Sequence, residues 1–98
     1  MANLEFLPGA RRELREAFDW YRQRNPAAAR RFVTEVDRVT AAIAAQPDRY
    51  GWYDPPFREA ILNRYPFSVI YRVDDAGDVL VVAVAHASRE PGYWLDRT

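Results

Sequence analysis

Apolar positions along the chain follow two different spacings, which separate its helices from its strands. From Ala10 to Tyr21 they recur every three or four residues, with Arg and Glu between them, which predicts an amphipathic helix. Asn25 and Pro26 then suit an N-cap and a first helical position, so a second helix is expected to begin there and to end near Pro47. The short connection predicts that the two helices form an antiparallel hairpin.

Strand-like segments flank this hairpin on both sides. Residue 47 to residue 57 contains three prolines and a glycine and is expected to be a loop, whereas residues 74–78 read as a hairpin turn. The last strand candidate is apolar throughout, as expected for a strand in the middle of a sheet. The strand candidates are residues 3–6, 57–63, 68–73 and 79–85.

The order of these elements predicts an α+β fold. An N-terminal strand comes first, and the two-helix antiparallel hairpin packs on a three- to four-stranded antiparallel sheet, in the order β-α-α-β-β-β. Residues 1–98 are expected to make one domain, because a chain of this length supports a single modest core.

Composition narrows the classes of function that need to be considered. The 14 basic residues, all arginine, are balanced by 14 acids, so the basic excess typical of nucleic-acid binding is missing and no direct, specific DNA binding by the chain alone is expected. With no cysteine and one histidine, we expect no disulfide, metal site or cofactor. No apolar run approaches a membrane span, so we expect a cytoplasmic protein without membrane contact.

Three stretches together resemble the RelE/ParE superfamily, the toxins of bacterial type II toxin–antitoxin systems. They are WYRQRNPAAARRFVTEVDRVTAAIAAQPDRYG for the helical hairpin, RYPFSVIYRVDDAGDVLVVAVAHASREP for the strands, and the closing YWLDR. The resemblance covers nearly the whole chain. It implies a cognate antitoxin as partner, and one of two activities: RelE-like members cut messenger RNA on the ribosome, whereas ParE-like members poison DNA gyrase without being nucleases.

The resemblance also allows the two branches to be compared at particular positions. RelE-like toxins that lack a catalytic histidine use a Lys-x-Lys pair and an arginine after the next turn, and these align with Glu59, Ile61 and Ser68 here. An acid, an alkyl group and a hydroxyl replace three cationic groups, which favours a ParE-like, non-enzymatic toxin that inhibits gyrase by protein–protein contact. A ribosome-dependent mRNA endoribonuclease is the alternative, and a relative that has lost its toxicity is a third hypothesis.

Each hypothesis has its own candidate residues. For the nuclease, the catalytic candidates are Glu59, Arg64, His86, Arg89 and Tyr93. Histidine suits proton transfer near neutral pH, but His86 would equally serve as a cap that bonds the backbone where the last strand ends. Arg64, beside a turn, would alternatively hold that turn.

Contact surfaces for protein partners form the other set of candidates. For a gyrase-like target they are Arg72, Arg89, Tyr93 and Trp94, although Tyr93 and Trp94 would also suit an aromatic tail folded back on the core. For the antitoxin they are the aromatics expected to be exposed: Trp20, Trp52, Tyr53 and Phe57. The antitoxin is expected to cover the outer side of the helical hairpin and the free edge of the sheet.

Overall fold

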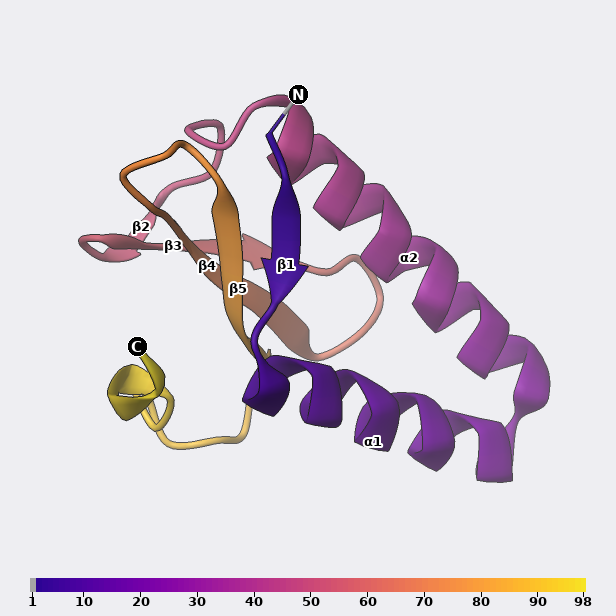
Figure 1. Cartoon of the computed structure of the whole chain (residues 1–98). Helices are drawn as coiled ribbons and strands as arrows, with labels where there is room; N and C mark the ends of the chain where they lie inside the picture. Colours follow the sequence, from indigo (N-terminus) through magenta and orange to yellow (C-terminus); the bar gives the residue numbers. More distant parts are fainter. Residues whose placement is uncertain (1) are drawn as a thin grey trace.

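The computed structural model describes residues 2–98 and confirms the α+β fold, with two helices on one face of a sheet and the C-terminal tail on the other (Figure 1). The strands of the sheet and the helices follow one another in the expected order, with additions described below. The elements are β1 (Leu4–Phe6), α1 (Pro8–Arg24), α2 (Pro26–Ala45), β2 (Trp52–Asp54), β3 (Phe57–Ile61), β4 (Phe67–Val73), β5 (Val79–His86) and a short 3-10 helix (Leu95–Arg97).

The sheet differs from the prediction in two respects. Its order is β1-β5-β4-β3-β2, so it has five strands rather than three or four, because β2 forms inside the proline-rich segment expected to be a loop and pairs with β3. It is also mixed, since β1 runs parallel to β5 while the other pairs are antiparallel. The helical hairpin between β1 and the later strands allows β1 to lie beside the last strand of the chain (Figure 1).

Local sequence determines where the helices begin and end. α1 begins at Pro8, two residues before the expected start, because proline is well accommodated in a first helical turn. The predicted cap at Asn25 is confirmed: its side-chain oxygen accepts hydrogen bonds from the backbone N–H groups of Ala27 and Ala28 at 3.1 and 3.2 Å. Asn25 also ends α1, so one residue makes the turn of the hairpin. Within residues 2–98, neither helix is long and apolar enough to cross a membrane.

Both faces of the central strands are covered, which explains why residues 79–85 are almost wholly apolar. On the helix side, α1 and α2 pack on β4 and β5 around residues such as Phe32, Val69 and Val81. On the opposite face, which we call the tail side, a second cluster contains Phe57, Ile70, Val82, Ala83 and Trp94. The tail therefore contributes to the core rather than extending from it.

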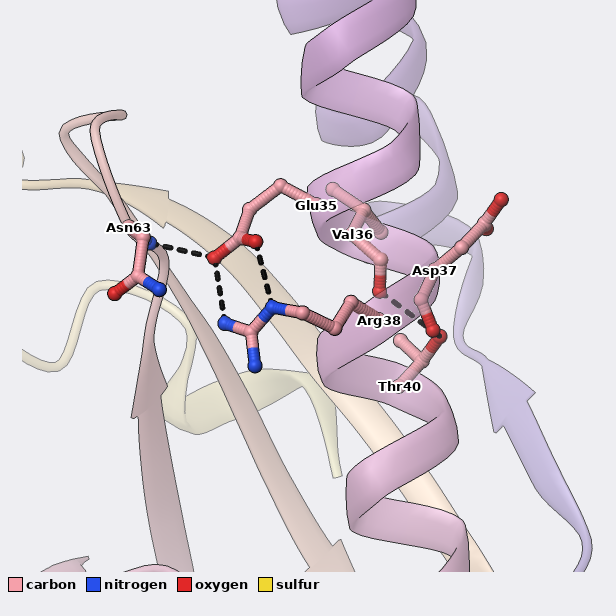
Figure 2. A network of polar contacts seen from close by, with 6 residues as sticks. All are labelled: Glu35, Val36, Asp37, Arg38, Thr40 and Asn63. Atoms are coloured by element: carbon pink, nitrogen blue, oxygen red, sulfur yellow. Dashed lines mark hydrogen bonds and ion pairs between the residues drawn. The ribbon is translucent and has the colours of Figure 1, made fainter.

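A polar network connects α2 to the turn between β3 and β4 (Figure 2). The carboxylate of Glu35 accepts two hydrogen bonds from Arg38, both 2.8 Å long, and one from the backbone N–H of Asn63 at 2.6 Å. These bonds, chiefly those from Arg38, hold the pKa of Glu35 below its ordinary value. Arg64, the next residue, has a positive φ of 69° and adds to this effect through its charge.

The lowered pKa of Glu35 predicts a pH-dependent contribution to stability. Because its pKa is lower in the folded than in the unfolded chain, Glu35 stabilises the fold above its unfolded pKa of 4.5, and this contribution is lost as the pH falls through the folded value. Urea unfolding should therefore show Glu35→Gln to be less stable than wild type at neutral pH, with the difference shrinking below pH 4.5. Glu16→Gln, at an exposed position of α1, serves as the control. A difference independent of pH would contradict the prediction.

Candidate functional site

Four of the five proposed nuclease residues line one small cavity at the end of the sheet: Glu59, His86, Arg89 and Tyr93. Side chains alternate between the faces of a strand, and Glu59 is paired with Ile70, whose side chain is in the tail-side cluster. The ring of His86 instead packs edge-on against Phe67, with 5.0 Å between centroids, beside the helix-side cluster. Arg64 lies in the turn between β3 and β4, exposed to solvent. The imidazole thus packs on Phe67 although His86 and Glu59 line the same cavity, and Arg64 lies outside that cavity.

His86 bonds to the chain immediately after it. Its Nδ1 accepts a 3.0 Å hydrogen bond from the backbone N–H of Ser88 and lies 2.8 Å from the Ser88 hydroxyl. Because a backbone amide only donates, Nδ1 carries no proton in this arrangement. His86 thus bonds the backbone where β5 ends, as expected if it acts as a cap rather than as a catalytic group. Among residues 2–98, no three histidine or carboxylate side chains gather in a way that would hold a metal ion.

A buried carboxylate that the sequence reading did not single out holds the tail in place. Glu13 on α1 is only 8% exposed. One of its oxygens accepts hydrogen bonds from the backbone N–H of Val84 at 3.0 Å and from Arg97 at 2.9 Å. The other accepts from Arg97 at 3.1 Å and from the hydroxyl of Tyr93. We call these interactions of Glu13, Arg97 and Tyr93 the tail clamp.

The tail clamp satisfies backbone groups that the sheet leaves without a strand partner. β1 pairs with β5 only as far as Val81, so the edge of β5 is open beyond that residue. There the carbonyl of Val82 accepts a 3.1 Å hydrogen bond from Arg97, and the N–H of Val84 donates to Glu13. Side chains thus replace the missing strand, which is one way in which proteins protect open edges.

The spacing of Glu13 along α1 is the feature of the sequence from which the tail clamp could have been predicted. It lies between Ala10 and Ala17 at helical spacing, on the face of α1 that is buried. An acid on a buried helical face needs a cationic or hydrogen-bonding partner. Burial, together with the Glu13 carboxylate, raises the pKa of Tyr93 far above its ordinary value, so that its hydroxyl remains a donor.

Two of the predicted contact aromatics are buried, which corrects their assignment to surfaces. Trp94 is 1% exposed and Phe57 is 7% exposed. Their rings meet with centroids 4.7 Å apart, and partly buried Tyr53 packs on Trp94 at 5.2 Å. Because the tail side of the sheet is apolar, the indole covers it and is not presented to a target. Trp94 therefore follows the alternative of a tail folded back on the core, and the expectation that Phe57 is exposed is wrong.

Other predicted contact residues do lie at the surface. Trp20 and Trp52 are 52% and 57% exposed, each with an arginine stacked on its ring. The guanidinium of exposed Arg89 stacks on the ring of Tyr93, with 3.9 Å between the Arg89 Cζ and the ring centroid. Partly buried Arg72 lies opposite Leu80 in the sheet, at the other end of β4. The arginines of the tail and of the sheet therefore do not form one patch.

The outer side of the helical hairpin carries an apolar groove. It encloses about 350 Å³ between α1 and α2. Its apolar lining includes Leu14, Phe18 and Val33, and Arg11 and Arg15 add cationic groups. The aliphatic side chain of Val33 is 37% exposed, so the groove presents apolar surface to solvent. We call this feature the hairpin groove.

Comparisons with known proteins place the chain in a family. The family model described as the ParE toxin of the type II toxin–antitoxin system parDE matches residues 4–91. A solved structure titled "Chromosomal ParDE TA system from P. aeruginosa" has the same fold, with a TM-score of 0.76 and 20% sequence identity over 90% of this chain and 98% of that chain. No curated protein sequence matches the chain. By its match to the family model, this protein belongs to the ParE toxin family.

Proposed function

We propose that this protein is a toxin that inhibits DNA gyrase by protein–protein contact in the cytoplasm, and that a cognate antitoxin neutralises it. Membership of the ParE toxin family supports the toxin role and the antitoxin partner. The choice of gyrase rests on what the family resemblance implies. The observation that carries the non-enzymatic mechanism is that Ile61 and Ser68, which pair across β3 and β4, stand where the resemblance would require cationic groups.

RNA cleavage would require an acid–base pair and cationic groups to meet at one phosphate. A general base and a general acid must lie within hydrogen-bond reach of the reacting atoms, and cationic groups must stabilise the charge of the transition state. Here Ile61 is paired with Ser68 at positions where the resemblance would require cations. Arg89 and Tyr93 stack on one another in the tail, and Tyr93 already donates to Glu13. These placements favour contact inhibition over the endoribonuclease alternative.

The proposed function is tested by following DNA and protein synthesis within minutes of expressing the chain alone in bacteria. We expect DNA synthesis to fall first, with cleaved plasmid trapped on gyrase. His86→Ala and Glu59→Gln, each confirmed to be folded, separate the mechanisms, because a nuclease would lose its activity in both and His86→Ala should leave gyrase inhibition intact. A first fall in protein synthesis, with cut messages, would overturn the proposal in favour of the endoribonuclease.

The hairpin groove is the proposed docking surface for the antitoxin. An amphipathic helix places its apolar face in such a groove. Trp20 lies on another side of α1, next to Glu16 and Ala17, so it would contact the antitoxin outside the groove. Since the chain has no net charge and the groove is mainly apolar, burial of apolar surface rather than charge would supply most of the affinity.

This docking mode predicts a complex that depends weakly on salt. The dissociation constant of the toxin–antitoxin complex should change only slightly between about 50 and about 300 mM salt, because apolar contacts are not screened. Val33→Asp should weaken binding about tenfold or more by placing a charge in the groove. Thr34→Asp, at the neighbouring exposed position outside the groove lining, is the matched control. A steep loss of affinity with salt, or equal effects of the two substitutions, would contradict the model.

A further inference from the structure

A small cavity lies between the C-terminal tail and the tail side of the sheet. It encloses about 150 Å³. The sheet contributes Glu59, Ser68 and Ile70 to its lining, and the aromatic residues Tyr53, Tyr93 and Trp94 also line it. His86 at the end of β5 also lines it, and Arg89 and Glu90 come from the loop that follows. We call this feature the tail cavity.

The carboxylate of Glu59 is the chemically distinctive group in the tail cavity. Glu59 is partly buried, and it makes neither a side-chain hydrogen bond nor an ion pair with any other residue in the described range 2–98. Its neighbour across the sheet is Ile70, and the side chains on either side of it on the same face of β3 are Phe57 and Ile61. A carboxylate among apolar neighbours loses hydration without gaining a partner, which favours binding of a cation.

The surroundings of Glu59 distinguish between kinds of ligand. A phosphate would be repelled by the carboxylate, whereas a guanidinium would bind it with two parallel hydrogen bonds. The aromatic rings of the lining offer faces on which a planar cation stacks. The nearby guanidinium of Arg89 lies on the ring of Tyr93 and forms no ion pair with Glu59.

We propose that the tail cavity is a docking site for the guanidinium of an arginine side chain from a protein partner. The volume of about 150 Å³ suits one side-chain end rather than a nucleotide. This inference rests on the proposed function in one respect: the partner that supplies the arginine is the protein target of the toxin.

The tail clamp makes this site rigid before a partner arrives. Tyr93 is held by Glu13, and the buried indole of Trp94 packs on the tail side of the sheet against the ring of Phe57. The aromatic wall is thus in position in the free protein, so binding does not have to order it. Such pre-organisation lowers the entropic cost of binding.

The experiment is an NMR titration of the full-length chain with Nα-acetyl-arginine methylamide. We expect saturable shifts of the Ser68 and Ile70 amides and of the Trp94 indole N–H, with a dissociation constant on the order of millimolar. The neutral citrulline analogue and inorganic phosphate should not produce them. Glu59→Gln, which keeps the size of the side chain, should weaken arginine binding about tenfold or more. Glu16→Gln, outside the tail cavity, should bind as wild type does.

Each remaining result overturns the proposal. No saturable shift with the arginine probe up to about 50 mM would remove the site. Equal binding of the citrulline probe would show that charge plays no part, and stronger binding of phosphate would point to an anion site. Thermal unfolding of Glu59→Gln verifies that the variant is folded. Because the titration needs no gyrase, failure of the arginine site and failure of the gyrase proposal give separate results.

Discussion

Replacing Glu13 with alanine is expected to lower the free energy of unfolding by about 3–5 kcal/mol, because it leaves buried polar and charged partners unpaired. The N–H of Val84 would lose its acceptor, and the guanidinium of Arg97, whose side chain is 19% exposed, would lose its counter-ion. For a domain of this size, each kcal/mol corresponds to roughly 4–8 °C in the melting temperature. Urea and thermal unfolding of the purified chain provide the measurement.

Two comparisons make the Glu13 result specific. Glu16→Ala removes an exposed acid one turn further along α1, and should change the stability by less than about 0.5 kcal/mol. A double-mutant cycle of Glu13→Ala with Arg97→Ala should show strong coupling, because the second substitution removes the charge that the first leaves unpaired. Additive effects, or a small loss for Glu13→Ala, would show that the tail clamp does not stabilise the fold.

Replacing Trp94 with alanine is expected to cost about 3–5 kcal/mol, since it empties the centre of the tail-side cluster. The same substitution at Trp20 or Trp52 should cost about 1 kcal/mol or less, because each ring is more than half exposed and loses mainly the contact with its stacked arginine. Denaturant unfolding of the three variants compares the same residue type at one buried and two exposed positions.

Tryptophan fluorescence gives an independent measure of the same arrangement. Trp94 should resist quenching by acrylamide, and Trp94→Ala should leave an emission dominated by the exposed Trp20 and Trp52. If Trp94→Ala were as stable as the other two variants, or if all three indoles were quenched equally, the tail would not pack as described.

These two predictions affect how mutations of the tail should be interpreted. Changes at Tyr93, Trp94 or Arg97 are expected to disturb the fold, so a loss of toxicity that they cause would not identify a contact with the target. Arg89 is exposed and its guanidinium rests on a ring surface, so Arg89→Ala should change the surface with little loss of stability. Arg89 is therefore the tail residue whose substitution reports on the target most directly.

Sequence periodicity was sufficient for the elements and for the fold class. The two helices, their cap at Asn25 and the α+β order follow from local chemistry, because spacing and capping act between residues close together in the chain. The exception was β2, whose three residues become a strand only because β3 provides a partner for their backbone. The parallel pairing of β1 with β5 also joins distant segments, which no local pattern reports.

The candidate site depended on tertiary structure far more than the fold class did. The sequence alone determined which chemical groups the chain possesses: one histidine, no lysine, and an acid at position 59 within a strand. Only the folded chain decided that Glu59 and His86 line one cavity while the imidazole packs on Phe67, and that Trp94 is buried. It also decided that Glu13 meets Arg97, 84 positions later, because burial and pairing arise from contacts between segments that the chain brings together only when it folds.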